Sequence, residues 1–390
     1  MIERDFVGTL ERRCNEDRNF IQILKGARQT GKTTALRQLQ KKLSLPVHSA
    51  AAAIDSSSRD WLRAQWTAAR NLVQENGEAL LIVDEVQLVD QWSAVVKELW
   101  DEDTWNETNL KVVLSGSSSL LLEKGLTEAL TGRFEIIPCT HWSFKECKQA
   151  FNHSLDDFLY FGGYPASAAL KDDHDRWLDY MQNSIITPSI ARDVVALEQV
   201  RRPALMEKLF WLGSSFSSQE ISYRKIMGQL DDAGNTTTLA HYLQLLNNAS
   251  LLCGLEKFAK KEIKTRASSP KFLTYDTSLM VATYGQNREF LLHDPERRGR
   301  LVESAVGARL LAESKRQNFK VYWWREGNDE VDFVIQKGER TTAIEVKSGR
   351  VKTTSGMTRF VNTFNPTKQL VVGSPVCPVE NFLQGEVELF

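Results

Sequence analysis

The sequence predicts a multidomain α/β protein whose first domain is built on a parallel sheet. An apolar strand, Phe20 to Leu24, runs into a glycine-containing loop and then into a helical pattern from Ala35 to Leu43. A second apolar run, Ala79 to Val83, ends in two acids, which is typical of a buried parallel strand. The C-terminal region alternates helix and strand patterns from Leu301 to Gly373. These three observations favour a doubly wound first domain and a smaller α/β domain at the end.

Composition limits the class of protein. The 390 residues include 49 Lys and Arg and 50 Asp and Glu, and this net charge of −1 excludes a protein that is basic throughout. No apolar run approaches the ~18 residues that span a bilayer, and acids near Met1 stand where a signal peptide needs bases. The five cysteines are odd in number and widely spaced, which favours reduced thiols. We therefore expect a cytoplasmic protein with no membrane partner.

The near-zero charge is a sum over unlike segments. Residues 78–107 hold nine acids against the single base Lys97, whereas residues 255–275 hold six bases against two acids. Overall neutrality argues against indiscriminate nucleic-acid binding and leaves DNA to the C-terminal half.

The loop after the first strand has the spacing Gly-x-x-x-x-Gly-Lys-Thr of a phosphate-binding loop. Its glycines let backbone N–H groups surround phosphates, and the positive N-terminal end of the next helix faces them. Lys32 is predicted to neutralise the β- and γ-phosphates of ATP, and the Thr33 hydroxyl to hold Mg²⁺. The predicted ATP-binding residues of this loop are Gly26, Ala27, Arg28, Gln29, Thr30, Gly31, Lys32, Thr33 and Thr34.

Asp84 and Glu85, at the end of the second apolar strand, supply what that loop lacks. Asp84 is predicted to complete the Mg²⁺ shell, and Glu85 to orient or deprotonate the attacking water. Alone, such a strand is more often one that simply meets solvent, but here it follows a phosphate-binding loop.

Two further positions are each open to two interpretations. The third strand, Lys111 to Leu114, ends in small polar residues, and ligands sit outside the carboxyl ends of such strands. Ser115 or Ser117 is therefore either a contact to the γ-phosphate or its water, or part of a turn that caps the next helix. Arg133 is either an arginine finger, acting within the chain or on a neighbouring copy, or a surface residue.

The middle of the chain has a helical pattern that is interrupted by a sharp turn at Phe161 to Pro165. Arg201-Arg202-Pro203 then indicates a boundary. Helical patterns follow at residues 205–214, 218–230 and 236–248, the last with Asn235 or Thr236 as N-cap, and strand patterns at 251–258 and 271–275 surround a basic tip. This outline is typical of a winged helix, which often places a helix in the DNA major groove. The alternative is a wing that packs against another domain with its lysines solvated.

A second set of acids lies in the C-terminal region. Glu303 falls on a predicted helix, Asp332 on a strand, and Glu345 and Lys347 on one face of the next strand across a hairpin. Two carboxylates can hold Mg²⁺ and a nearby lysine can activate water for attack on a phosphodiester, with Glu303 as a third ligand. The structural alternative is an ordinary Glu–Lys pair on a strand.

Together these motifs resemble those of bacterial and archaeal AAA-family ATPases that carry a C-terminal restriction-endonuclease-like domain of unknown function. The resemblance covers nearly the whole chain and rests on residues 26–34, 81–87, 114–118, 130–133, 161–165, 192–193, 270–279, 330–334 and 344–347. It implies four domains: an AAA-type P-loop ATPase with a parallel sheet (1–140), a helical lid (141–200), a winged helix (201–292) and a restriction-endonuclease-like α/β domain (293–390). It implies ATP binding and leaves the activity of the last domain open. Ser278 departs from the pattern, since relatives often have Gly there.

Two functions follow as hypotheses. The first is an ATP-binding, Mg²⁺-dependent ATPase that places a winged helix and a metal-dependent endonuclease on DNA, with Glu85, Arg133, Asp332, Glu345 and Lys347 as catalytic residues and Thr33, Asp84, Glu303, Asp332 and Glu345 as metal ligands. The second is a nucleotide-gated switch or scaffold whose C-terminal domain binds a protein or nucleic acid without cutting it. A homo-oligomer or a protein partner fits either. Carboxylates that converge with Lys347 favour the enzyme, and a Glu–Lys pair closed onto itself favours the scaffold.

Overall fold

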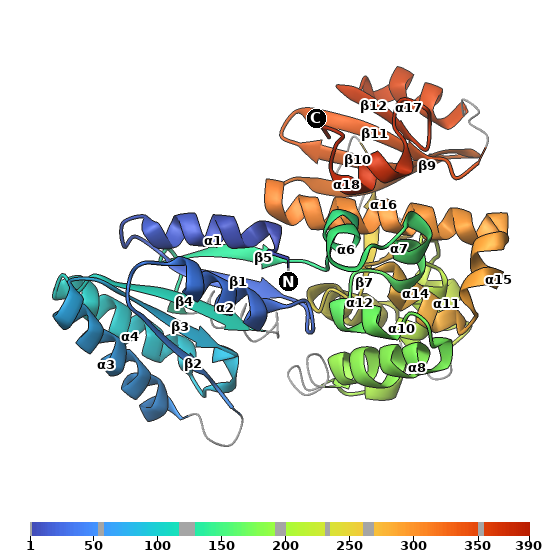
Figure 1. Ribbon diagram of the computed structural model, residues 1–390. Coiled ribbons are helices and arrows are strands. Elements are labelled where there is room, and N and C mark those ends of the chain that lie inside the picture. The colour runs from blue at the N-terminus through green and yellow to red at the C-terminus, as the bar shows by residue number, and fades with distance from the viewer. Residues whose placement is uncertain are drawn as a thin grey trace. The chain divides into compact units, whose positions relative to one another are not determined.

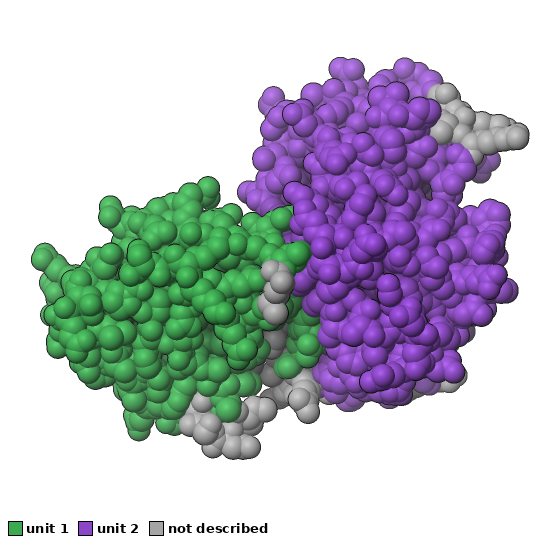
Figure 2. Space-filling view, in the orientation of Figure 1, with its two compact units in different colours: residues 1–140 green, residues 141–390 purple. Residues whose placement is uncertain are grey.

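The computed structural model describes residues 2–53, 58–116, 129–191, 200–230, 235–259, 269–349 and 355–390. The chain forms two compact units, residues 1–140 and 141–390 (Figure 2). The three domains predicted after residue 140 all fall within the second unit. Among the described residues, no helix combines the length and the apolar character that crossing a membrane requires. The five cysteines are free and buried.

The first unit is a five-stranded sheet in the order β2-β3-β4-β1-β5, in which all neighbouring strands are parallel (Figure 1). Because β4 lies between β1 and β3, the carboxyl ends of these three strands meet at one edge of the sheet. The elements are α1 (Asp5–Asn15), β1 (Ile21–Gly26), α2 (Lys32–Lys42), β2 (Val47–Ala51), α3 (Arg59–Asn76), β3 (Ala79–Asp84), η1 (Val86–Leu88), α4 (Trp92–Trp105), β4 (Leu110–Gly116) and β5 (Phe134–Cys139).

Helices cover both faces of this sheet because alternate residues of a strand point to opposite sides. Leu81 and Val83 of β3 belong to a core with α3 and α4, whereas Leu80 and Ile82 belong to a core with α1 and α2. All six residues of β3 are buried, which explains its continuous apolar sequence.

The acidic segment of residues 78–107 is partly neutralised by α3. Arg63 lies 2.6 Å from Glu98 of α4, and Arg70 lies 2.6 Å from the buried Asp103. The sequence shows these acids as one segment. It does not show which bases pair with them, because those bases are distant along the chain.

The second unit combines helices with one large sheet. Its helices are α6 (Phe144–Phe151), α7 (Leu155–Phe161), η2 (Pro165–Leu170), α8 (His174–Asp179), the π-helical η3 (Tyr180–Ile186), α10 (Pro203–Ser215), α11 (Tyr223–Met227), α12 (Thr236–Asn248), α14 (Thr277–Tyr284), α15 (Arg288–His293), α16 (Pro295–Gln317), α17 (Ser355–Phe364) and α18 (Val379–Gln384). Its strands are β6 (Gln219–Glu220), β7 (Leu252–Lys257), β8 (Lys271–Thr274), β9 (Lys320–Glu326), β10 (Asp329–Lys337), β11 (Arg340–Val346) and β12 (Lys368–Val372).

These seven strands form one sheet in the order β12-β11-β10-β9-β7-β8-β6. The sheet is continuous because β7 and β9 pair in parallel, with Glu256 opposite Tyr322 and Lys257 opposite Trp323. The Trp323 indole also donates to the Leu255 carbonyl at 3.1 Å. The strands predicted for the winged helix and those predicted for the C-terminal domain therefore share a sheet.

Two of the sequence motifs meet in a buried joint of the second unit. The backbone N–H of Gly163, in the Gly-Gly-Tyr-Pro turn, donates to Asp276 at 2.7 Å. Asp276 also caps α14 by accepting from the N–H of Ser278 at 3.0 Å. Burial raises the pKa of Asp276 to about 6, although these donors favour its charged form. The turn predicted at residues 161–165 thus positions α14, and Ser278 is accommodated in the helix without left-handed backbone.

Candidate functional site

The phosphate-binding loop lies between β1 and α2, at the edge where the carboxyl ends of β1, β3 and β4 meet. Gly31 precedes the helix with a φ of 93°, a left-handed conformation that favours glycine. Gly26 lies against the backbone of Cys139 in β5, so that a larger residue there would collide with that strand. Both glycines of the motif are therefore required by the backbone itself.

Side chains inside this loop come from three parts of the first unit. The Lys32 ammonium is buried and donates to the carbonyls of Ala27 at 2.7 Å and Gly26 at 3.1 Å. Thr30 donates its hydroxyl to the Ala27 carbonyl at 2.9 Å. Arg4, just before α1, donates to the Thr30 carbonyl at 2.6 Å and is itself buried. Arg4 positions the loop, and no motif in the sequence indicated it, since the contact joins residues far apart in the chain.

Thr33 and Asp84, the two predicted Mg²⁺ ligands of this domain, lie together. The Thr33 hydroxyl donates to the Asp84 carboxylate at 2.6 Å, across the gap between α2 and β3. Ser115 of β4 donates to the other Asp84 oxygen. A hydroxyl and a carboxylate at the end of a phosphate-binding loop are the oxygen donors that Mg²⁺ takes beside a nucleotide, so the residues fit the ion. The Ser115 hydroxyl thus orients Asp84, a role that neither interpretation from the sequence gave it, and both of those interpretations stay predictions.

Glu85 lies next to this pair. Its backbone is left-handed, with a φ of 55°, and its carboxylate accepts from the Gln87 amide at 2.5 Å. An uncommon conformation in a non-glycine residue at the end of a strand is a feature of functional sites. Glu85 is thereby held beside Asp84 by its local turn.

Arg133 is not brought to the phosphate-binding loop. It stands at the beginning of β5, where its carbonyl accepts from the N–H of Ile21, the first residue of β1. Gly26 is five residues further along β1, which corresponds to about 16 Å of strand. The Arg133 guanidinium instead pairs with Asp101 at 2.8 Å. This geometry contradicts a contact of Arg133 with the nucleotide of its own domain. Action on a neighbouring copy and a surface role both stay predictions. Ser117 lies outside the described residues.

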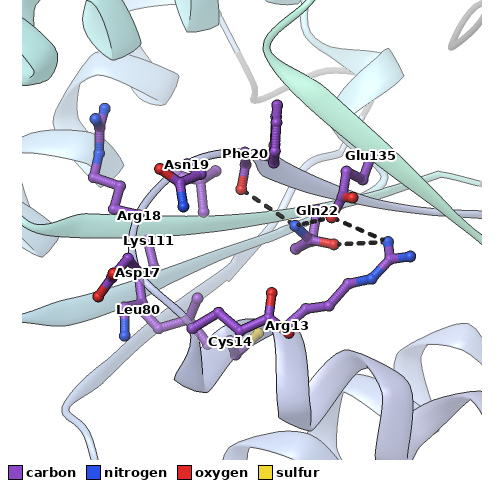
Figure 3. Close-up of a pocket in the computed structure, with 12 residues that line it drawn as sticks. Arg13, Cys14, Asp17, Arg18, Asn19, Phe20, Gln22, Leu80, Lys111 and Glu135 are labelled. Carbon is purple, nitrogen blue, oxygen red and sulfur yellow. Dashed lines mark hydrogen bonds and ion pairs between the residues drawn. The ribbon is translucent and has the colours of Figure 1, made fainter.

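A small cleft of about 90 Å³ opens at the opposite edge of the same sheet (Figure 3). Its lining includes Arg13, Gln22 and Glu135, and these polar groups bind one another: Arg13 lies 3.2 Å from Gln22 and 3.3 Å from Glu135. Ligands of parallel sheets bind at the carboxyl ends of strands, whereas this cleft lies at the amino ends. The cleft therefore does not lie where parallel sheets usually bind nucleotides.

The acids of the C-terminal region are arranged around lysines. Lys347, directly after β11, lies 2.6 Å from Glu345 of that strand, so the two form an ion pair. Asp332 accepts from the backbone N–H of Val346 at 2.7 Å. The predicted ligands Glu303, Asp332 and Glu345 do not form a metal site: in the part of the chain that the structure describes, no group of three or more His, Cys, Asp or Glu side chains is arranged to hold a metal ion.

The group that joins Glu303 to Asp332 is Lys271, from β8. Its ammonium lies 2.6 Å from Glu303, 3.2 Å from Glu330 and 3.7 Å from Asp332, and only 2% of its side chain is exposed. Burial alone lowers the pKa of an ammonium, but the three carboxylates outweigh it and raise the pKa of Lys271 above its usual value. Burial also raises the pKa of Glu303, which the ammonium opposes. Lys271 keeps its charge in either state of Glu303, because Asp332 and Glu330 remain beside it.

Neither Lys271 nor Glu330 was singled out as a site residue from the sequence. Glu330 had a usable signal, because it stands two residues before Asp332 and therefore shares its face of the strand. The signal for Lys271 was weaker: it is a lysine at the first position of an apolar strand.

Comparison with known proteins agrees with the geometry of the first unit. Residues 18–148 match the family described as AAA domain, and residues 152–289 and 298–380 match two domains of unknown function, DUF8612 and DUF4143. The first unit therefore contains an AAA domain with the P-loop α/β fold. The prediction of an AAA-type P-loop domain is confirmed.

The relatives of the whole chain have no stated activity. An uncharacterized protein of Methanocaldococcus jannaschii is 27% identical over 286 residues, which cover 68% of this chain but only 60% of that protein. An uncharacterized protein of Haemophilus influenzae is 24% identical over 355 residues, 85% of this chain and 83% of that one. Among solved structures, a Walker-type ATPase of Pyrococcus abyssi is similar, with a TM-score of 0.47 and 14% identity over 73% of this chain and 96% of that one.

Proposed function

We propose that this chain is a Mg²⁺-dependent ATPase that uses its nucleotide state to control DNA binding by the second unit. The observation that carries the ATPase part is the meeting of Thr33 with Asp84 at 2.6 Å beside the buried ammonium of Lys32. Lys32 would bind the β- and γ-phosphates, and Thr33 and Asp84 would hold Mg²⁺. The ion supplies charge neutralisation at the phosphate oxygens when bound. Glu85 accepts a proton from, or orients, the attacking water.

The order of elements in residues 203–274 supports a winged helix. A helix (α10), a short strand (β6), two helices (α11, α12) and two longer strands (β7, β8) follow one another, and β8 pairs with both β6 and β7. The buried face of α12 holds leucines and Tyr242, while His241 and Gln244 on its other face are exposed. Exposed polar side chains on this helix suit contacts to base edges.

Positive charge next to α12 supports DNA as the partner. Arg224 and Lys225 on α11 are exposed, which suits contacts to phosphates. The predicted basic tip between β7 and β8, residues 260–266, lies wholly outside the described residues. The proposal therefore rests on α11 and α12 rather than on the tip.

The test is binding of a fluorescein-labelled DNA duplex to the full chain, followed by anisotropy over a range of salt concentrations. Arg224→Ala and Lys225→Ala should each weaken binding for every sequence and lower the salt slope by about 1. Lys148→Ala, which removes an exposed lysine from α6, is the matched control and should leave binding unchanged. Equal slopes for all three variants would overturn the role of α11, and an affinity that does not respond to ATP would overturn the coupling.

The C-terminal domain has two candidate roles, a metal-dependent endonuclease and a domain that binds without cutting. The Glu345–Lys347 pair at 2.6 Å favours the second, because an ammonium that bonds a neighbouring carboxylate is not directed at a water molecule. Incubation of the pure protein with supercoiled and linear DNA and Mn²⁺ separates the two. Nicking by the wild type that is lost in Asp332→Ala would support the endonuclease role instead.

A further inference from the structure

Lys271 belongs to the predicted winged helix, yet its charge lies among the acids of the C-terminal domain. We use the name lysine cluster for Lys271, Glu303, Glu330 and Asp332. Lys271 is in register on β8, opposite Glu220 of β6 and Leu255 of β7. Glu303 projects from α16, and Glu330 and Asp332 project from β10. The cluster therefore ties three elements together with one ammonium.

The ammonium is held as a fixed part of the fold. Besides its three carboxylates, it contacts the Asp332 carbonyl at 3.4 Å and the face of the Phe333 ring at 5.4 Å. The helix that carries Glu303 is held in place next to β8, because the hydroxyl of Ser304 bonds those of Ser217 and Ser218, each at 2.9 Å. Lys271 is thus buried by the same contacts that place α16.

Cations of the chain itself pair with the carboxylates around the cluster. Arg325 of β9 pairs with Glu330 and, at 3.0 Å, with Glu220. Lys347 pairs with Glu345. Each of the five carboxylates of this region thus lies beside one of three cations; the carboxylates are Glu220, Glu303, Glu330, Asp332 and Glu345, and the cations are Lys271, Arg325 and Lys347. A metal-dependent nuclease centre instead leaves several carboxylates for a divalent ion to neutralise.

We propose that the Lys271 ammonium stands in the place of a divalent cation, so that the acidic site of the C-terminal domain binds strand β8 instead of a metal. The site is then a joint between the winged helix and the C-terminal domain, and the protein does not cleave nucleic acid there. This inference develops the non-cutting role proposed above. It does not depend on ATP hydrolysis, so its test and that of the ATPase can fail separately.

The test measures Mn²⁺ binding by the full, nucleotide-free chain, from the loss of the electron paramagnetic resonance signal of free Mn²⁺. All proteins carry Asp84→Asn, so that the phosphate-binding loop contributes no site. The parent protein should bind no Mn²⁺ in the acidic site, and Lys271→Ala should gain one Mn²⁺ per chain. Adding Asp332→Asn to Lys271→Ala should remove that gain. Lys111→Ala, which takes away another largely buried lysine paired with Glu78, is the matched control and should gain nothing.

Two results would overturn the proposal. One is Mn²⁺ binding by the parent protein that disappears in Asp332→Asn, since the site would then take a metal with Lys271 present. The other is a folded Lys271→Ala variant that gains no Mn²⁺, since the ammonium would then not occupy a cation site. If Lys271→Ala does not fold, the parent protein still decides: metal binding or DNA nicking that depends on Asp332 contradicts the proposal, and the absence of both supports it.

Discussion

Replacing Lys271 by methionine should destabilise the second unit by about 3 kcal/mol. Removing one partner from a buried ion pair costs roughly 3–5 kcal/mol, because the remaining charge is left without a partner. The cost here belongs at the lower end, since Glu330 keeps Arg325 and Asp332 keeps the N–H of Val346. The main loss is at Glu303, whose 2.6 Å contact with the ammonium disappears.

Hydrogen exchange of the β10 amides, followed by mass spectrometry, measures this effect in the second unit alone. A change of 3 kcal/mol corresponds to exchange that is faster by roughly a hundredfold, since about 1.4 kcal/mol is a factor of ten. Lys320→Met removes an exposed lysine from the neighbouring β9 and should leave β10 exchange unchanged. The double variant Lys271→Met with Glu303→Gln should be about as stable as Lys271→Met, because burial raises the pKa of Glu303 and favours its neutral form once the ammonium is gone. Exchange in Lys271→Met within threefold of the wild type would refute the reasoning.

Three further predictions concern the first unit and the buried joint. Lys32→Ala should weaken ATP binding by about tenfold to a hundredfold in calorimetric titration, because it removes charge-assisted bonds of ~1.5–3 kcal/mol. Arg37→Ala on the same helix is the control and should leave the affinity unchanged. Equal affinities of the Lys32→Ala variant and the wild type would contradict the assignment of the site. Arg4→Ala removes the 2.6 Å hydrogen bond to the buried Thr30 carbonyl and should cost about 0.5–1.5 kcal/mol of stability, with weaker ATP binding; wild-type values for both would show that Arg4 does not position the loop. Burial raises the pKa of Asp276 from 3.8 to about 6, so its favourable contribution is complete below pH 3.8 and is lost as pH rises through 6. The stability of the wild type relative to Asp276→Asn should therefore fall by up to about 3 kcal/mol between pH 4 and 7 in urea unfolding, and parallel pH profiles would contradict this.

Much of the nucleotide site could be predicted from the sequence because its parts are local. The loop from Gly26 to Thr33 is one contiguous segment, and Asp84 ends a strand whose burial on both faces is visible as an unbroken apolar run. Neighbouring parallel strands end at the same edge, so the meeting of Thr33 and Asp84 follows from pattern and topology together. Arg4 could not be predicted, because its contact with Thr30 depends on how α1 packs.

The location of Arg133 relative to the phosphate-binding loop could not be predicted from the sequence. Its position after the third strand agreed with an arginine finger, but a strand begins at one edge of a sheet and ends at the other. Since Arg133 precedes β5 and the phosphate-binding loop follows the parallel strand β1, the two lie at opposite edges. The parallel pairing of β1 with β5 decides at which edge of the sheet Arg133 lies, and this pairing cannot be read from the order of residues alone.

By itself, the sequence determined that the first unit carries a phosphate-binding loop and which acids the strands of the C-terminal region contain. Spacing and periodicity carry that information because they describe groups on one segment or one face of an element. Only the tertiary structure decided what those acids face. Lys271 and Glu303 come from different elements, β8 and α16, and the contacts of Ser304 with Ser217 and Ser218 hold α16 beside β8. A buried charge must find a partner wherever the fold provides one, and here that partner is a lysine of the same chain.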